Sequence, residues 1–387
     1  MESNWNSLSS DLTELILSYL PIRSIIVASA VCKVWRSVVT QSSFSARVSP
    51  TKKPWFFICG QNNIFPKNNQ AFGFDPESNE WIRLPTTLFP PRPAQDESFI
   101  GSGGFFFMTT SSTSKFSYAP VLKGRSSWRE TPPLRFSRCN PLVGVFTAGS
   151  RSKFIVVGGV RFIDGLVGIE DRLAVEIYDP DLNSWELCPP LPAGFRSRNS
   201  TQWLTSALFK GKFFVFGIYS CFVSSFDLNR RLWSGVQTLR PPGVSFSFLI
   251  ACRDQLVLAG LCNTPSGQSF NLWRVDDRTM EFSEIDIMPQ ELLYCLFDSD
   301  EDDKFASLKC VGLGDLIYVF NEEPHKKYPA CVCEINGQDS RCKWKKVPDL
   351  PGPVNRFHKE AGFGRKSASG RHSLHGPTMM HLLYPPR

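Results

Sequence analysis

Four segments of the chain carry one short pattern: an aromatic or apolar residue, then Asp, then a second aromatic residue six positions after that Asp. They are Phe74-Asp75 through Trp81, Tyr178-Asp179 through Trp185, Phe226-Asp227 through Trp233, and Val275-Asp276 through Phe282. Asp and the polar residues that follow it are typical of a tight turn, after which the aromatic side chain lies opposite its neighbour on the next strand. The pattern therefore predicts a repeated β-hairpin, and looser copies end at Trp128 and Trp344.

The six aromatic positions, 81, 128, 185, 233, 282 and 344, are spaced by 47, 57, 48, 49 and 62 residues. A period near 50 is that of a kelch-type propeller blade, which contains four strands. A β-sandwich is the alternative architecture, but it does not need an aromatic residue at one place in every unit. Because the aromatic residues recur once per unit, we interpret Trp81, Trp185 and Trp233 as structural anchors and not as ligand contacts.

An apolar strand precedes each aromatic position. These strands are Phe56 to Gly60, Phe105 to Thr109, Phe154 to Gly159, Phe213 to Gly217, Leu256 to Gly260 and Leu316 to Phe320. The run Phe154 to Gly159, together with Tyr178 and Trp185, resembles a kelch repeat, whereas the other copies keep one glycine or none. We therefore expect an all-β, six-bladed kelch-type β-propeller of degenerate repeats over residues 51–366.

Blade one has no convincing innermost strand before Trp55. The segment Phe357 to Gly364 is available to supply it, which would close the ring from the C-terminal side. Residues 367–387 are basic and contain histidine, and we expect them to form a flexible tail.

The first 50 residues have helical periodicity instead. Apolar residues recur at helical spacing from Leu12 to Leu20, behind a start at Asp11 and Glu14 that resembles a capping box, and Pro21 ends this stripe. A second stripe comprises Ala28, Val31, Trp35 and Val38. Two or three helices in about 35 residues bury little surface, so the unit is expected to need a partner.

The run Leu8-Ser9-Ser10-Asp11-Leu12, followed by Ile16, Leu20-Pro21, Ile22, Ile25 and Val31-Cys32-Lys33-x-Trp35-Arg36, resembles the F-box. Ser9 stands where that family usually has its first proline. The resemblance implies a three-helix F-box over residues 1–50 that binds a Skp-type adaptor and, through it, a cullin and a RING subunit. The alternative is a small helical cap packed on the rest of the chain. The F-box resemblance assigns ten residues to the adaptor surface and its supporting core: Leu8, Leu12, Leu15, Ile16, Leu20, Pro21, Ile22, Val31, Cys32 and Trp35.

An F-box in front of kelch repeats resembles a large plant family. It implies the substrate-recognition subunit of an SCF-type (Skp, cullin, F-box) E3 ubiquitin ligase, which catalyses no reaction itself. The alternative is a protein-interaction scaffold outside any ligase. The sequence contains no G-x-S-x-G, P-loop or H-E-x-x-H motif, so we expect neither an enzyme nor a cofactor.

Cysteines and histidines do not form a recognisable ligand pattern. The 12 cysteines are spread along the chain without a C-x-x-C pair, which predicts free thiols in a reducing compartment and no metal site. The five histidines all lie between His325 and His381. No secretory signal or membrane span is apparent, so we expect a soluble protein of the cytoplasm or nucleus.

The predicted target site follows from the topology of a propeller. In a four-stranded meander, the loops between second and third strands share one face with the links between blades, and on this face the loops are long. The net charge of +7 is scattered along the chain, so nucleic-acid binding is not favoured. Arginine binds carboxylate or phosphate through two parallel hydrogen bonds, so we expect an acidic or phosphorylated target. The arginines assigned to this face are Arg92, Arg135, Arg138, Arg196, Arg198, Arg240 and Arg356.

Overall fold

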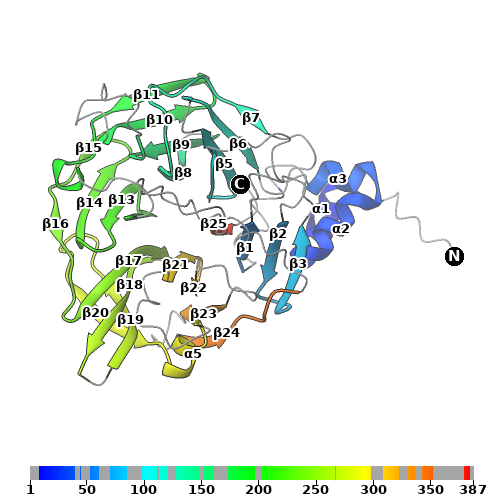
Figure 1. Ribbon diagram of the computed structural model, residues 1–387. Helices are drawn as coiled ribbons and strands as arrows, with labels where there is room; N and C mark the ends of the chain where they lie inside the picture. Colours follow the sequence, from blue (N-terminus) through cyan, green and yellow to red (C-terminus); the bar gives the residue numbers. More distant parts are fainter. Residues whose placement is uncertain are drawn as a thin grey trace, which may run out of the picture.

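The computed structural model describes residues 8–39, 44, 53–60, 70–84, 97–110, 113–120, 128–148, 151–160, 173–196, 203–265, 267–297, 308–321, 329–335, 342–351 and 379–383. Three short helices precede six antiparallel sheets that radiate around a common axis, and the helices lie outside the ring next to β3 (Figure 1). This arrangement confirms the predicted F-box-like helices and the six-bladed all-β propeller. No helix in these ranges is long and apolar enough to cross a membrane.

The helices are α1 (Ser10–Tyr19), α2 (Ile22–Val31) and α3 (Lys33–Val39). Ser9, and not the Asp11 of the predicted capping box, is the N-cap of α1: its hydroxyl accepts the backbone N–H of Leu12 at 3.3 Å. Between α2 and α3 the backbone of Cys32 is extended, with φ −152° and ψ 166°. The Cys32 sulfur then accepts the backbone N–H of Trp35 at 3.4 Å, so one residue ends α2 and supports the start of α3.

Each blade is a four-stranded antiparallel sheet whose strands follow one another from the axis of the ring outward. From the innermost strand to the outermost, blade one contains β25 (Met379–Leu383), β1 (Trp55–Gly60), β2 (Gln70–Asp75) and β3 (Glu80–Leu84). Blade two contains β4 (Glu97–Ser102), β5 (Phe105–Thr110), β6 (Phe116–Pro120) and β7 (Arg129–Glu130). Blade three contains β8 (Leu142–Ala148), β9 (Arg151–Val157), β10 (Val175–Asp179) and β11 (Ser184–Cys188).

The remaining blades follow the same order. Blade four contains β12 (Leu204–Phe209), β13 (Lys212–Gly217), β14 (Phe222–Asp227) and β15 (Leu232–Trp233), and β16 (Gln237–Thr238) also pairs with β14. Blade five contains β17 (Val244–Cys252), β18 (Gln255–Thr264), β19 (Gly267–Val275) and β20 (Phe282–Ile287). Blade six contains β21 (Leu308–Leu313), β22 (Leu316–Asn321), β23 (Ala330–Ile335) and β24 (Cys342–Lys346). A short helix, α5 (Gln290–Tyr294), links blades five and six.

The repeated aromatic pattern forms the hairpin between the third and fourth strands. Tyr178 pairs directly with Trp185, and Phe74 pairs with Trp81 in the same register. The carboxylate of the intervening Asp accepts backbone N–H groups of the turn, as Asp179 does from Asp181 at 2.9 Å. The residue two before the aromatic has a positive φ, 58° at Asn79 and 47° at Asn183, which asparagine tolerates well. Turn chemistry therefore explains the constant spacing.

The ring closes through β25, which pairs antiparallel with β1. A C-terminal strand does supply the innermost strand of blade one, as expected, but its residues are Met379–Leu383 and not Phe357 to Gly364, which lie outside the described residues. The expectation that residues 367–387 form only a flexible tail was accordingly wrong for this strand. Which C-terminal segment pairs with β1 depends on contacts between distant parts of the chain, and local sequence periodicity does not indicate it.

Buried apolar clusters occupy all six seams between neighbouring blades, and a seventh lies within the N-terminal helices. In the seam between blades six and one, the ring of Phe56 stacks on Tyr318 with centroids 4.5 Å apart. Each blade is thus stabilised by its two neighbours.

Candidate functional site: an apolar face on the N-terminal helices

Helix α1 presents its apolar residues to solvent. Its buried side chains are Leu17 and three polar residues, Thr13, Glu14 and Ser18. The exposed side chains include Leu12, Leu15, Ile16 and Tyr19, and Tyr19 is 76 % exposed. This is the reverse of the usual arrangement for a helix on a water-soluble domain, in which the apolar stripe packs on the core.

Helices α2 and α3 extend this exposed surface. Val27, Val31 and Val34 are each 62 or 63 % exposed. We call the following set the apolar face: Leu8, Leu12, Leu15, Ile16, Tyr19, Val27, Val31 and Val34. Soluble monomers rarely leave so many large apolar side chains uncovered within one small unit, and such patches mark interaction sites.

A small core supports the apolar face. Leu17, Ile25, Ala28, Val38 and Phe44 are buried together, and the half-buried Leu20, Trp35 and Val39 pack against them. The three helices therefore form a unit with its own interior, and the apolar face lies outside that interior.

The predicted adaptor residues are divided between these two environments. Leu8, Leu12, Leu15, Ile16, Pro21, Val31 and Cys32 are exposed, whereas Leu20 and Trp35 pack against the core. The side chain of Ile22 lies outside the described residues. Sequence reasoning did not assign Tyr19, Val27 or Val34 to this surface, although Val27 and Val31 have the i, i+4 spacing that places two residues on one side of a helix.

A salt bridge joins the helices to the propeller at blade one, and Lys53, which follows the helices in the sequence, makes further polar contacts with the propeller. Arg23 of α2 forms an ion pair with Glu80 at the start of β3, with 2.9 Å between Nη1 and Oε2. Lys53, just before β1, forms an ion pair with Glu334 of blade six at 2.5 Å, and its backbone N–H reaches the Glu77 carboxylate at 3.4 Å. Glu77 and Glu80 belong to the turn between the third and fourth strands, so the helices join the face that carries these turns.

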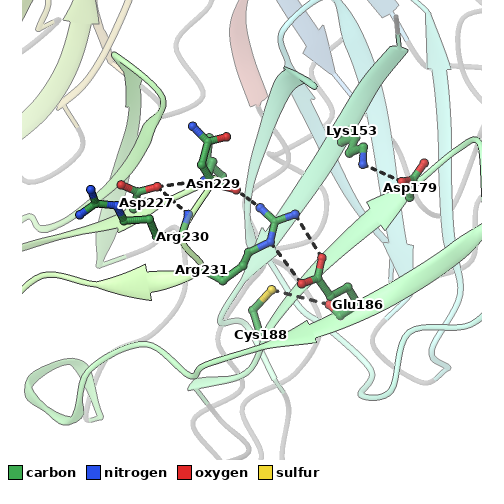
Figure 2. A network of polar contacts seen from close by, with 9 residues as sticks. Lys153, Asp179, Glu186, Cys188, Asp227, Asn229, Arg230 and Arg231 are labelled. Carbon is green, nitrogen blue, oxygen red and sulfur yellow. Dashed lines mark hydrogen bonds and ion pairs between the residues drawn. The ribbon is translucent and has the colours of Figure 1, made fainter. Parts of the chain in front are cut away.

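The two faces of the propeller differ in how their charges are used. We call the face with the turns between third and fourth strands the turn face, and the opposite one, with the links between blades, the loop face. On the turn face, the guanidinium of Arg231 in blade four donates two hydrogen bonds to the carboxylate of Glu186 in blade three. They run from Nε to Oε1 at 3.2 Å and from Nη2 to Oε2 at 3.1 Å (Figure 2). Lys210 of blade four likewise pairs with Asp277 of blade five at 2.7 Å.

Two turn aspartates of Figure 2 are held in their charged form. Lys153 donates to Asp179 at 2.6 Å and, as the main cause, lowers the pKa of that carboxyl group. Backbone N–H groups of Arg230 and Asn229 lower the pKa of Asp227. The charges of this face therefore stabilise the fold itself.

The arginines predicted for target binding are only partly on the loop face. Arg135, Arg196 and Arg240 are exposed in links between blades. Arg92, Arg198 and Arg356 lie outside the described residues. Arg138 is 0 % exposed, so the assignment of this residue to a binding surface was wrong.

Arg138 instead completes the glycine turn after β9. Its Nη1 donates to the carbonyls of Gly158 at 2.7 Å and Ala174 at 2.8 Å, and its Nη2 forms an ion pair with Glu176. Burial lowers the pKa of the guanidinium, and the Glu176 carboxylate opposes that effect. At Gly159, where φ is 69°, a Cβ would lie 2.7 Å from the Cys139 carbonyl oxygen, so the turn and the link that carries Arg138 are closely packed.

The described cysteines are all free thiols. Among the described residues, no group of three His, Cys, Asp or Glu side chains is arranged to hold a metal ion.

Comparison with known proteins matches the F-box domain family to residues 5–47. An F-box/kelch-repeat protein of Arabidopsis thaliana is 29 % identical over 91 % of this chain and 87 % of its own length. F-box only protein 13 of the same plant is 26 % identical over 84 % of this chain and 76 % of its own length. F-box only protein 6 is 23 % identical over 80 % of this chain and 62 % of its own.

Proposed function

We propose that this chain, which matches the F-box domain family over residues 5–47 and is similar over most of its length to a plant F-box/kelch-repeat protein, is the substrate-recognition subunit of an SCF-type E3 ubiquitin ligase. In this role the F-box binds a Skp-type adaptor, which connects it to the cullin and RING subunits, and the propeller binds the target protein. The receptor itself catalyses no reaction: ubiquitin is transferred because the target is held near the recruited enzymes.

The apolar face carries this proposal. An exposed aliphatic or aromatic side chain contributes about 1.5 to 3 kcal/mol when it is fully buried, so covering several of these residues supplies a strong driving force for association. The polar residues Thr13, Glu14 and Ser18 lie on the buried side of α1, so the side that faces solvent is the apolar one. A protein partner that covers Leu12, Ile16 and Tyr19 is the arrangement that this helix requires.

Ser9 is compatible with that role. The family usually has a proline here, and proline favours the first turn of a helix because its φ is preset. In this chain the Ser9 hydroxyl accepts a hydrogen bond from the Leu12 N–H. This N-cap bond supports the start of α1 in place of the preset φ of a proline. The position of α1, and with it the apolar face, is retained.

The two-sided layout of the propeller supports a receptor role. The helices attach beside Glu77 and Glu80 on the turn face, which leaves the loop face free when an adaptor is bound. On the turn face, Lys210 and Arg231 form ion pairs with carboxylates of neighbouring blades. On the loop face, Arg135, Arg196 and Arg240 are exposed in the links between blades. We assign the target to this face and propose an acidic or phosphorylated recognition segment, because arginine pairs with carboxylate and phosphate.

Co-purification with a Skp-type adaptor and a cullin tests the adaptor assignment. The double variant Leu12→Glu, Ile16→Glu should reduce adaptor capture at least tenfold, because two charges would have to be buried against the partner. Leu232→Glu, at an exposed leucine on blade four, is the control and should leave capture unchanged. Full capture by the double variant would remove the apolar face from the interface.

Capture of the adaptor without the cullin by the unaltered chain would favour the alternative function, a scaffold outside a ligase. The measurement therefore separates the two functions as well as testing the surface.

A library of phosphoserine peptides, with matched serine peptides, tests the target face. Arg196→Glu, Arg240→Glu should abolish retention of phosphopeptides while adaptor capture and melting temperature stay the same. Arg230→Glu, Arg278→Glu changes two arginines of the turn face and serves as the matched control. Undiminished retention by the first variant, or equal loss in the control, would move the target site away from these arginines.

A further inference from the structure

Two thiols, one from the link between blades five and six and one from blade six, meet in the seam between these blades. Cys295 follows α5, in the link that connects these blades, and Cys331 lies in β23, the third strand of blade six. Their sulfur atoms are 3.7 Å apart, which is van der Waals contact, and both thiols point at the carbonyl oxygen of Leu292, at 3.0 Å from Cys295 and 3.5 Å from Cys331. No atom therefore separates the two sulfurs.

The two thiols differ in access to solvent. Cys295 is half-buried, whereas Cys331 is 0 % exposed. Because only Cys295 keeps exposed surface, an oxidant from solvent approaches the pair from the Cys295 side. This is the layout of a reactive thiol beside a resolving thiol, in which the accessible sulfur is oxidised first and the protected one then displaces the oxygen.

The charge state of Cys295 fits the reactive role. A hydrogen bond from Cys331 lowers the pKa of the Cys295 thiol to about 7, against the opposing effect of burial. Lys346 at the end of β24 lowers the pKa further and Asp349, which pairs with Lys346 at 3.4 Å, raises it. At other thiols burial is the largest effect: it raises the pKa of Cys188 and of Cys252 to about 12, which keeps these thiols protonated and inert.

We propose that Cys295 and Cys331 form a site of reversible oxidation, at which hydrogen peroxide converts the two thiols into one disulfide between the α5 link and blade six. The Cys295 thiolate attacks one peroxide oxygen, the O–O bond breaks, and the hydroxide that leaves takes a proton to become water. The Cys331 sulfur, after losing its proton, then attacks the Cys295 sulfur, the S–O bond breaks, and a second water leaves. Two thiols are oxidised and one peroxide is reduced to two waters.

The sulfurs must approach from 3.7 Å to about 2.05 Å to form this bond. Cys295 supplies the movement because it ends a helix of five residues in a link between blades, whereas Cys331 is fixed in a central strand. The disulfide attaches the α5 link, which belongs to the loop face, to blade six. The disulfide is detected on the chain alone, without adaptor or target, so the test does not depend on the proposed function.

Peptide mapping of the full-length chain tests the proposal. The folded protein is treated with a stoichiometric amount of hydrogen peroxide, remaining thiols are blocked with N-ethylmaleimide, and the digest is analysed by mass spectrometry. We expect a cross-linked peptide that joins Cys295 to Cys331, lighter by two hydrogen atoms than its reduced parts and lost on treatment with dithiothreitol. Cys32, an exposed thiol of the helices, serves as an internal measure of oxidant exposure.

Two variants separate the roles of the sulfurs. In Cys331→Ser the disulfide should be absent and Cys295 should stop at the sulfenic acid, which dimedone traps. In Cys295→Ser the thiol of Cys331 should stay reduced. Both variants are compared with the unaltered chain by thermal melting, and the cross-link in the unaltered chain is the primary result, so it does not depend on either variant folding.

The pH dependence of alkylation supplies a second measurement. The rate at Cys295 should reach half its maximum near pH 7, as set by its lowered pKa. Cys331→Ala removes the donor and should move the midpoint toward about 8.5, which lowers the thiolate fraction at pH 7 by about fifteenfold. The proposal is overturned if Cys32 is oxidised while no link from Cys295 to Cys331 forms, if Cys333 and Cys342 are joined in its place, or if Cys331→Ala leaves the midpoint unchanged.

Discussion

Trp81 in blade one donates its indole N–H to the main-chain carbonyl of Pro348 in blade six, at 2.6 Å, across the seam where the ring closes. The same bond recurs between consecutive blades: Trp185 donates to Pro132 at 2.8 Å and Trp233 to Pro189 at 3.0 Å. Trp344 donates instead to the Asp286 carboxylate at 3.0 Å. At these four of the six repeat positions the tryptophan thus forms a hydrogen bond to the preceding blade or its link, consistent with the interpretation of Trp81, Trp185 and Trp233 as structural anchors.

These tryptophans are half-buried, so their bonds can be tested separately from their bulk. Trp185→Phe keeps most of the apolar contact and loses the hydrogen bond, which should lower the free energy of unfolding by about 1 kcal/mol. Trp185→Ala also loses the packing against Phe116 and Tyr178, and should lower it by about 3 kcal/mol. Urea unfolding measures both values, and equal effects of the two variants would show that the ring contributes nothing beyond its N–H.

The buried pair of Arg138 and Glu176 should be expensive to break. Arg138→Met leaves the buried Glu176 carboxylate without its cation and removes one donor from each of two buried carbonyls, which should lower the free energy of unfolding by about 3 to 5 kcal/mol. Arg135→Met, three residues earlier at an exposed position, should change it by less than about 0.5 kcal/mol. Chemical denaturation of both variants is the measurement, and a stable Arg138→Met protein would mean that another group replaces the guanidinium.

The turn aspartates should make stability sensitive to acid. The pKa values of Asp179 and Asp227 are lowered in the folded state, so their contribution is present above the ordinary aspartate pKa of about 3.9 and is lost as the pH falls through the lowered values. Asp179→Asn keeps an oxygen acceptor for the turn but does not titrate, so the fall in melting temperature below about pH 4 should be shallower than in the unaltered chain. Asp254→Asn, at an exposed position in the turn between β17 and β18, is the control and should keep the original slope. A steeper slope in Asp179→Asn would contradict the sign of the shift.

The closing strand should be required for a stable ring. Truncation after residue 378 removes β25 and leaves the inner edge of β1 unpaired, which should lower the melting temperature and expose a strand edge that promotes aggregation. Truncation after Leu383 keeps β25 and should melt like the full chain. Light scattering during the melt distinguishes the two, and identical curves would place the closing strand elsewhere.

Short-range patterns determined much of this structure. The hairpin from Asp179 to Trp185 depends on the turn chemistry of a few residues, so its spacing, and with it the number of blades, is visible in the sequence. The second strand of each blade is likewise a continuous apolar run, because it is covered on both sides. The helices before residue 40 and their resemblance to an F-box could also be predicted, since the motif lies within 29 residues from Leu8 to Arg36.

The tertiary structure decided everything that depends on which distant segments meet. Nothing local distinguishes the buried Arg138 from the exposed Arg135, because the difference lies in Glu176 of β10 and in two carbonyls next to β9 and β10. The closing strand is set by pairing with β1 across more than 300 residues. The thiols of Cys295 and Cys331 meet only because the link between blades five and six packs against β23. Helical periodicity showed that α1 is amphipathic, but only the packed core showed that its apolar side faces outward. A sequence pattern encodes local turn and strand geometry, whereas contacts between distant residues depend on how the closed ring places them.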